Sequence, residues 1–283
     1  MKLIIYIAVL ILNISFVFPK NFMWEVQSET NTCYILGSVH LADSSLYPLA
    51  PEITDAFDKS KALVLEIDIS NINPMEVLKF TMLPDTNTLA GEVDPATYNR
   101  FVELFKKHNV PAMSYSKLKP WFAVMTLQSL EMIEGNYSAE YGIDMYFLDK
   151  AQSKNLKIKA LETLEFQMKV LDTLNNFSGK FLDYTLEELN ESAAQVSDIL
   201  SAWKNGDTQK MNEIINDGSD IEGFSDVMHI INNARNYNMV DKIQDYLRES
   251  DVHFVVVGAA HLIGPEGIIE LLKSKNKFKI TQK

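Results

Sequence analysis

The chain is nearly free of cysteine. Cys33 is the only one among 283 residues, so no disulfide bond can form within the chain. Cys33 lies inside an apolar run, where a small buried side chain is its expected role. The sequence also lacks Cys-x-x-Cys and His-Glu-x-x-His, the familiar zinc signatures, and the Gly-x-Ser-x-Gly motif of serine hydrolases. The sequence therefore cannot be assigned to the classes of zinc protein or serine hydrolase that these local motifs define.

Basic residues are outnumbered by acidic ones. The chain has 26 Lys and Arg against 38 Asp and Glu, a formal net charge of −12, and it contains no basic stripe. Nucleic acid is therefore not an expected partner. Apolar residues make up 47% of the chain, which fits a globular protein with a sizeable core.

Long apolar runs are also missing, except at the start of the chain. There, Lys2 is followed by an apolar run that continues to about Phe18. One positive charge before such a run is the layout of a signal peptide, so residues 1–20 predict export to the periplasm or the outside of the cell. The alternative is an uncleaved N-terminal anchor that associates the protein with a membrane. No small-x-small cleavage site stands out, so the cleavage point stays open.

Two apolar runs near opposite ends of the chain share one pattern. Residues 32–40 and 254–261 each contain an apolar run that reads as a buried strand, and each stretch finishes in Gly-x-x-His. Residues 22–26 predict an entry strand that pairs with the first run across a polar turn. A helix from Pro51 leads to another strand at 61–68, and this β-α-β unit predicts that the strand at 32–37 and the strand at 61–68 are parallel neighbours.

The middle of the chain, from about residue 75 to 250, is predicted to be mostly helical. Pro95 and Pro120 each open a helix with an apolar stripe, and a short strand is expected at 156–161. Apolar residues from Leu186 to Trp203 trace one long seam. The prediction is therefore an α/β domain over residues 21–283, with a central mixed, largely parallel sheet flanked by helices and a helical middle insertion.

Side chains that can bind a metal or accept a proton lie at four predicted strand ends: His40, Glu66, Glu162 and His261. Open α/β sheets bind their ligands at the carboxyl edge, where such ends meet. A water-activating site needs neutral imidazole or carboxylate ligands and a carboxylate base. We therefore hypothesise that these four residues form one site.

Roles within this site follow from chemistry. His40 and His261 are the expected ligands of a divalent metal, and Glu66 either completes the coordination or acts as a general base on water. Arg235, on a predicted helix, is expected to stabilise developing negative charge or to hold a carboxylate. Glu162 is the second candidate catalytic carboxylate. The other histidines, His108, His229 and His253, are assigned structural roles.

The ordered set of motifs resembles the TraB/PrgY/GumN family, which includes the Tiki proteins. The resemblance spans residues 22–283. It rests on the motifs at residues 24–26, 34–40, 47–49, 51–53, 65–68, 141–144, 161–163, 235–236, 257–262 and 264–267, and on Gln167.

The resemblance implies a fold like that of the erythromycin esterases and the haem-binding ChaN proteins. It also implies a site made of His40, His261, Glu66 and Arg235. Tiki proteins are metal-dependent peptidases that remove an N-terminal segment from Wnt ligands. The expected function is therefore that of an exported hydrolase of the peptidase type, which uses a divalent ion such as Mn, Co or Zn and acts on a peptide or protein.

Two other functions fit the same residues. One is a protein that binds a peptide or haem without turnover, and the other is a membrane-anchored interaction protein that retains its N-terminus.

Overall fold

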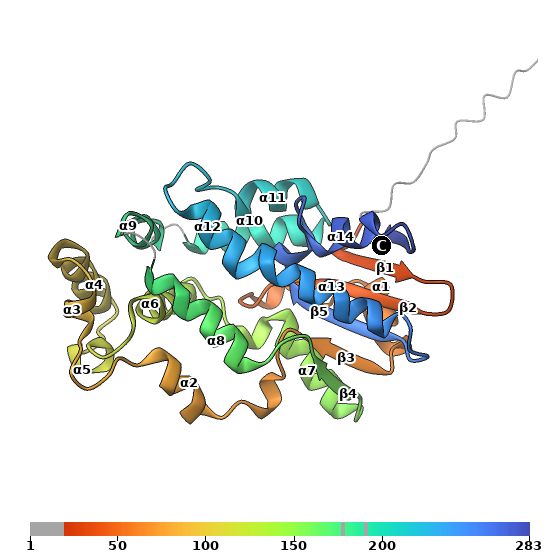
Figure 1. Ribbon diagram of the computed structural model, residues 1–283, viewed down its shortest axis with the longest axis horizontal. Coiled ribbons are helices and arrows are strands. Elements are labelled where there is room, and N and C mark those ends of the chain that lie inside the picture. Colours follow the sequence, from red (N-terminus) through yellow and green to blue (C-terminus); the bar gives the residue numbers. More distant parts are fainter. Residues whose placement is uncertain (1–19, 177–178, 190–191) are drawn as a thin grey trace, which may run out of the picture.

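The computed structural model describes residues 20–176, 179–189 and 192–283, and the predicted leader lies outside this part of the chain except for Lys20. Its centre is a six-stranded sheet in the order β4-β3-β5-β2-β1-β6 (Figure 1). The strands are β1 (Met23–Gln27), β2 (Thr32–Ser38), β3 (Ala62–Leu65), β4 (Lys157–Ala160), β5 (His253–Gly258) and β6 (Lys279–Gln282).

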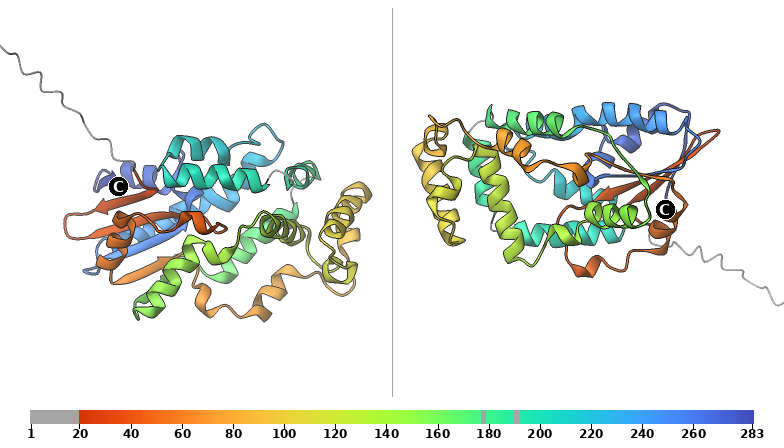
Figure 2. Two further views of the ribbon diagram at one scale, coloured as in Figure 1. Left: turned by 180° about the vertical axis from the view of Figure 1, so that it is seen from behind. Right: turned by 90° about the horizontal axis from the view of Figure 1, so that it is seen from below.

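Helices surround this sheet and extend beyond one end of it (Figures 1 and 2). None of the helices in the described ranges combines the length and the apolar content that a membrane crossing needs. The α-helices are α1 (Pro51–Lys59), α2 (Pro74–Thr81), α3 (Leu89–Glu92), α4 (Pro95–Lys107), α5 (Ala112–Tyr115), α6 (Pro120–Glu134), α7 (Ile143–Ser153), α8 (Leu164–Asp172), α9 (Gly179–Glu188), α10 (Ser192–Lys204), α11 (Thr208–Ile215), α12 (Phe224–Met228), α13 (Ala234–Tyr246) and α14 (Ile268–Ser274). The shorter turns are η1 (Ser44–Leu46), η2 (Ile69–Asn71), η3 (Ala139–Tyr141), η4 (Thr173–Asn176), η6 (His229–Asn233) and η7 (Ala259–Leu262).

The strand pairings confirm a mixed, largely parallel sheet flanked by helices. Strand β5 pairs in parallel with both β2 and β3, and β3 pairs in parallel with β4. The entry hairpin is also confirmed, because β1 runs antiparallel to β2 with Met23 opposite Leu36. At the far edge, β6 is antiparallel to β1.

One predicted pairing is wrong. Strands β2 and β3 are parallel, but they are not neighbours, because β5 lies between them. The first five residues of β5 are all buried, and a strand that is apolar on both faces is most stable in the centre of a sheet. The chain therefore returns to the middle of the sheet near its end. This return brings the second Gly-x-x-His motif beside the first.

Proline begins the helices where the sequence predicted it. Helices α1, α4 and α6 start at Pro51, Pro95 and Pro120, where the fixed φ of proline suits the first turn and its missing N–H costs no hydrogen bond. At α4 the preceding Asp94 caps the helix, since its Oδ1 accepts from the N–H groups of Ala96 at 2.9 Å and Thr97 at 3.2 Å.

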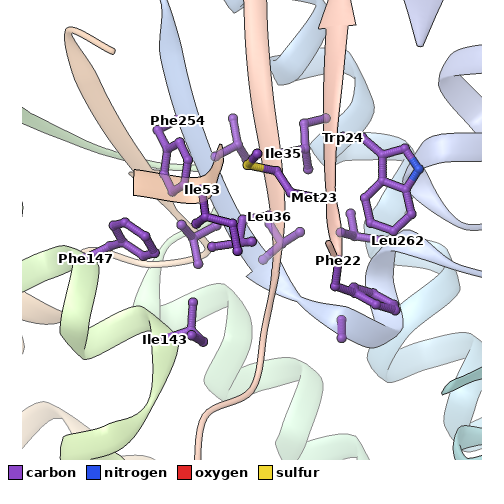
Figure 3. Packing of buried hydrophobic residues seen from close by; sticks show 14 of the residues in the cluster. Phe22, Met23, Trp24, Ile35, Leu36, Ile53, Ile143, Phe147, Phe254 and Leu262 are labelled. Atoms are coloured by element: carbon purple, nitrogen blue, oxygen red, sulfur yellow. The ribbon is translucent and has the colours of Figure 1, made fainter. Parts of the chain in front are cut away.

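Aromatic rings join one face of the sheet to its covering helices. Helices α1 and α7 cover this face, while α13 covers the other and packs against α14 (Figures 1 and 2). The rings of Phe57 on α1, Phe147 on α7 and Phe254 on β5 lie within contact of one another, with centroids 4.7–5.4 Å apart. Figure 3 shows Phe147 and Phe254 beside Ile53, inside the main hydrophobic core.

The helices remote from the sheet have a hydrophobic core of their own. This second core is built on α3 to α6 and α9 and contains Phe101, Phe105 and Leu127. The apolar seam predicted from Leu186 to Trp203 divides between the two cores. Leu186 belongs to the second core on α9, whereas Trp203 belongs to the main core on α10.

A buried histidine stands at the amino end of β5. The His253 ring is fully buried and stacks on Tyr246 with centroids 4.6 Å apart. Lys159 Nζ lies 2.9 Å and Glu249 Oε2 3.3 Å from its Nε2. Burial lowers the pKa of His253 and the Lys159 ammonium lowers it further, while Glu249 and Asp251 act in the opposite direction.

This ring predicts a pH-dependent stability. Below about pH 6.5, His253 is protonated in the unfolded chain but stays neutral in the folded chain, because its folded-state pKa is lower. The free energy of unfolding therefore falls as the pH decreases from about 6.5 toward the folded-state pKa. His253→Phe keeps a stacked ring but cannot titrate. Its free energy of unfolding, measured with urea, should fall less than that of the wild type between about pH 7 and about pH 5. The exposed His229 is the control, because His229→Phe should keep the wild-type dependence. Equal pH dependence in His253→Phe and wild type would contradict the prediction.

Candidate metal centre at the carboxyl edge of the sheet

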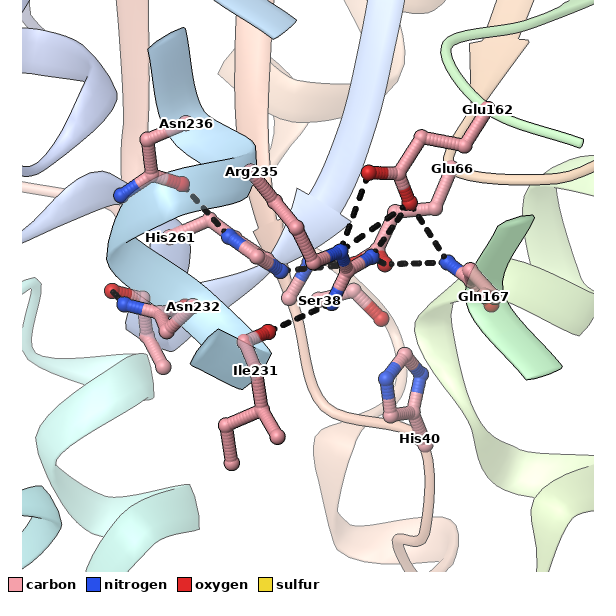
Figure 4. Close-up of polar contacts among 12 residues, drawn as sticks. Ser38, His40, Glu66, Glu162, Gln167, Ile231, Asn232, Arg235, Asn236 and His261 are labelled. Carbon is pink, nitrogen blue, oxygen red and sulfur yellow. Dashed lines mark hydrogen bonds and ion pairs between the residues drawn. The ribbon is translucent and has the colours of Figure 1, made fainter. Parts of the chain in front are cut away.

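The strand order places the four predicted site residues along one edge. Glu162 follows β4, Glu66 follows β3, His261 follows β5 and His40 follows β2. Pairing between β3 and β4 continues past the strand ends, because the Glu162 N–H donates to the Glu66 carbonyl at 2.7 Å. Strands β2 and β5 end level with each other, with Ser38 opposite Gly258. Figure 4 shows the four side chains in one cluster with Arg235.

Glu66 is held on both carboxylate oxygens. Its Oε1 accepts from the Gly258 N–H at 2.8 Å, and its Oε2 accepts from Arg235 Nη2 at 2.6 Å and Gln167 Nε2 at 2.9 Å. Burial alone would raise the pKa of Glu66, but the neighbouring His261 and Arg235 outweigh it, and the pKa is lowered to about 2. Glu66 is therefore an anion at neutral pH and a weak proton acceptor.

Arg235 bridges the two glutamates. Its Nη2 lies 2.6 Å from both Glu66 Oε2 and Glu162 Oε2, and its Nε lies 3.0 Å from Glu162 Oε1. The side chains of Arg235 and Glu162 are only 11% and 3% exposed. Burial would lower the pKa of Arg235, but the two carboxylates raise it. The guanidinium is thus bound within the protein, where it holds carboxylates in place (Figure 4).

His261 presents one ring nitrogen to Glu66. Its Nδ1 lies 2.6 Å from Asn236 Oδ1, and the Asn236 amide nitrogen donates to the Glu266 carbonyl at 2.8 Å. This pairing orients the amide, so His261 Nδ1 carries the hydrogen and Nε2 keeps its lone pair. Burial lowers the pKa of His261 to about 4, which leaves the ring neutral at pH 7. Its Nε2 faces Glu66 Oε1 at 3.7 Å.

His40 is held from the other side by α7. Its Nδ1 lies 2.7 Å from Asp144 Oδ2, which also accepts a hydrogen bond from the Ser38 hydroxyl. The protein that surrounds the pocket would lower the pKa of His40, but the Asp144 carboxylate outweighs this effect and raises the pKa to about 9. The His40 side chain is 67% exposed, so solvent screens part of that attraction. The ring borders a pocket of about 210 Å³ that also reaches Glu66 and Gln167.

Gly142 allows α7 to approach His40. A Cβ at this position would lie 2.3 Å from the His40 carbonyl oxygen, so only glycine fits there. The next residue, Ile143, donates its N–H to the Val39 carbonyl at 3.1 Å. These backbone contacts bring Asp144, in the first turn of α7, within reach of the imidazole.

The three candidate ligands surround a small space above Gly258. A Cβ on Gly258 would lie 3.3 Å from Glu66 Oε1, 3.6 Å from His261 Cδ2 and 3.9 Å from His40 Nε2. The glycine of the first motif has a different surrounding, because a Cβ on Gly37 would lie 2.5 Å from the Phe22 ring. The two Gly-x-x-His motifs are thus not equivalent. Gly258 leaves room among the candidate ligands, and Gly37 leaves room for the Phe22 ring in the core.

A tighter group of potential ligands lies elsewhere. Among the residues that the structure describes, His108, Glu131 and Glu134 have ligand atoms within 4.8 Å of one another, whereas the atoms around Gly258 are more widely spaced. In that group Lys107 Nζ lies 2.7 and 2.8 Å from the two Glu131 oxygens. A lysine ammonium therefore already neutralises this carboxylate, and the group ties α4 to α6.

A wider helical turn leads into Arg235. The π-helical η6 joins α12 to α13, and such turns are frequent at functional sites. The Ile231 carbonyl accepts from Arg235 Nη1 at 2.7 Å, and Asn232 Nδ2 donates to the Ala260 carbonyl at 3.1 Å. The turn therefore fixes the guanidinium and anchors the short turn that carries His261.

Sequence reasoning assigned no role to three residues that hold the cluster in place: Asp144, Asn236 and Gln167. Each lies in a motif that supports the family resemblance, but its partner is distant in the chain. Spacing along the sequence carries no signal for such a contact. The nearest clue is Gly142 before the start of α7, since a glycine there indicates a close backbone approach.

Fold and site together define a class. The protein is an α/β protein whose sheet edge carries two imidazoles and a carboxylate around one glycine, with each imidazole Nδ1 bound to a side-chain oxygen. Such outer partners are typical of metal-binding histidines. The cluster is therefore a candidate metal centre.

Comparison with known proteins places the chain more closely: it belongs to the TraB/PrgY/gumN family, whose model matches residues 22–282. The uncharacterized protein YbaP of Escherichia coli K12 is 25% identical over 241 residues, covering 85% of this chain and 87% of the relative. The metalloprotease TIKI1 of Xenopus tropicalis is 22% identical over 308 residues, covering 90% of this chain but 60% of the relative. An uncharacterized protein of Treponema pallidum is 19% identical over 271 residues. No solved structure matches significantly.

The bridging arginine predicts a large stability effect. Arg235→Ala leaves the buried carboxylates of Glu66 and Glu162 facing each other without a cation, which should cost about 3–5 kcal/mol in the free energy of unfolding, measured with urea. Adding Glu162→Gln should recover part of this loss. Arg100→Ala is the control, because its ion pair with Glu187 is exposed and should contribute less than about 1 kcal/mol. Equal losses in the two arginine variants would show that the bridge does not hold the site together.

Proposed function

We propose that the protein is an exported, metal-dependent hydrolase that cuts peptide bonds in a peptide or protein. One observation carries the proposal: the neutral His261 Nε2 and the Glu66 Oε1 carboxylate, both acceptors, face each other at 3.7 Å. Two lone pairs without a hydrogen between them favour a cation or water in that space. The distant relationship to the metalloprotease TIKI1 supports the same function.

The residues fit a divalent ion. His40 Nε2, His261 Nε2 and Glu66 Oε1 would hold it in the space that Gly258 leaves open. Imidazole nitrogen and carboxylate oxygen together suit Zn, Co or Mn, so the donor set does not select one of them. When bound, such an ion lowers the pKa of a coordinated water and polarises a peptide carbonyl.

The protein's own groups keep the ligands ready. Asn236 holds His261 in the tautomer that exposes Nε2, and Asp144 orients His40 in the same manner. Binding of the ion would require His40 to lose its proton, so occupancy should increase with pH. Gln167 and the Gly258 N–H hold Glu66 as an anion.

The geometry supports a division of roles among the acidic residues. Both oxygens of Glu66 are hydrogen-bonded and its pKa is lowered to about 2, which favours the ligand role over that of a general base. Both oxygens of Glu162 bind Arg235. We therefore assign Glu162 and Arg235 as positioning residues that keep Glu66 in place.

A binding protein without turnover is the second candidate. Both oxygens of Glu66 and both oxygens of Glu162 accept hydrogen bonds, so neither carboxylate is free to act as a general base, and this favours binding without turnover. A Glu66→Gln variant separates the candidates. It should bind a test peptide as well as wild type in a pure binder, but should lose metal and cleavage in a hydrolase. Titration with haem, followed by a Soret band, tests the haem alternative.

The hydrolase proposal predicts that metal and activity disappear together. Purified wild-type protein should contain about one divalent ion per chain by elemental analysis, and it should cleave members of a peptide library in a chelator-sensitive manner. The double variant His40→Ala, His261→Ala should lose the ion and at least about 100-fold in cleavage rate. Full cleavage by this variant would refute the proposal.

A matched pair of glycine variants provides the control. The Gly258 backbone, with φ −49° and ψ 137°, accepts any L residue, and the nearest atom to a new Cβ is a side-chain oxygen at 3.3 Å. Gly258→Ala should therefore fold but lose metal, because the methyl group occupies the site. Gly91→Ala adds the same methyl group, with its nearest neighbour 3.8 Å away, and should keep both metal and activity.

We further propose that the protein is exported, with residues 1–20 either removed as a signal peptide or retained as a membrane anchor. The apolar run after Lys2 supports export. Mass spectrometry of the N-terminus of the protein isolated from its host should find a chain that begins near residue 20 if the leader is removed. An intact N-terminus on protein in the cytosol would contradict both versions.

A further inference from the structure

A second cavity lies beside the candidate metal centre. Its volume is about 430 Å³, within the usual range for ligand sites, and its walls come from α6, η4, α9 and the run from α12 to η6. Most of the wall is apolar. The residues that matter here are Trp121, Val124, Met125, Leu174, Val227 and Ile231.

Two helical segments connect this cavity to the metal centre. On the run from α12 to α13, Ile231 lines the cavity and its carbonyl accepts from Arg235 Nη1 at 2.7 Å. The second segment is α8 with the turn η4 that follows it: Gln167 on α8 binds Glu66, and Leu174 on η4 lines the cavity. Figure 4 shows the Ile231 side chain directed away from the Arg235 guanidinium.

The charge of the cavity wall is of one sign. Glu92 and Asp94 are the charged residues among its lining, both are exposed, and no lysine or arginine lines it. Gln128, also in the wall, has a side-chain amide with no hydrogen-bond partner among the described residues. The apolar wall suits an apolar side chain, and the nearby carboxylates favour a ligand that is neutral or basic. The Gln128 amide can form hydrogen bonds with a peptide backbone.

We propose that this cavity is a specificity pocket that takes a bulky apolar side chain of the peptide substrate. The inference rests on the proposed function and adds the substrate class: a neutral or basic peptide with a Phe-like or Leu-like residue near the bond that is cut. Burial of the side chain in the cavity should tighten binding roughly tenfold or more.

The test uses a series of capped decapeptides built from Gly, Ser and Lys, with a single Phe moved through the positions. Binding of each fluorescently labelled peptide to chelator-treated full-length protein is measured by anisotropy, and cleavage is measured after metal is restored. Phe-containing peptides should bind at least about tenfold more tightly than the Phe-free parent. Cleavage should occur at one preferred distance from Phe. A parallel series with Glu in place of Lys should bind more weakly.

Two methionine variants localise the effect. Met125 lines the cavity and is 41% exposed, so Met125→Glu places a charge in the wall at a position that tolerates water. It should abolish the preference for Phe. Met113 is 88% exposed and does not line the cavity, so Met113→Glu makes the same chemical change elsewhere and should leave the preference unchanged. Met125→Leu should keep the preference.

Each outcome decides one claim. The pocket inference is overturned if Phe has no effect on binding, or if Met113→Glu reduces the Phe preference as much as Met125→Glu. Cleavage whose site does not depend on the position of Phe also overturns the pocket inference, but it leaves the hydrolase proposal intact. Binding that depends on Phe and on Met125, in a protein that cleaves nothing, supports the pocket and refutes the hydrolase.

Discussion

The Arg235 bridge between Glu66 and Glu162 is the interaction on which the site depends. Two carboxylates that are nearly excluded from water repel each other unless a cation lies between them, and Arg235 supplies that cation at 2.6 Å from both. The bridge also joins three elements, since the glutamates follow β3 and β4 while the arginine lies on α13. Because Glu66 is held as an anion, its other oxygen can face the Gly258 N–H and the His261 ring.

The position of β5 explains why one site can draw on both ends of the chain. This strand enters between β2 and β3, so His261 lies between the residues that follow those strands. The two Gly-x-x-His motifs then serve different purposes. Gly258 leaves space among three candidate ligands, whereas Gly37 admits the Phe22 ring into the core. His261 is buried and neutral, while His40 lies at the open side of the site.

Two helical segments connect the candidate metal centre with the apolar cavity. On α8, Gln167 binds Glu66, and the turn that follows lines the cavity. The π-helical turn before Arg235 also lines the cavity, and its Ile231 carbonyl binds the Arg235 guanidinium. A side chain bound in the cavity would therefore contact the elements that position the ligands. If the proposed activity holds, one rigid scaffold would set both the chemistry and the choice of substrate.

Local pattern in the sequence determined the strands, the helices that begin at proline, and the four polar residues at strand ends, because each depends on neighbours a few residues away. The strand ends also predicted that these four residues lie at one edge of the sheet. The order of the strands could not be predicted in this way, because β5 could join the sheet at several places. Only the packing of its two apolar faces places β5 in the centre. Tertiary contacts also decided that Asp144 and Asn236 orient the imidazoles, that Arg235 holds carboxylates, and that the seam from Leu186 to Trp203 serves two cores. These contacts join residues remote in the chain, and no spacing along the sequence encodes them.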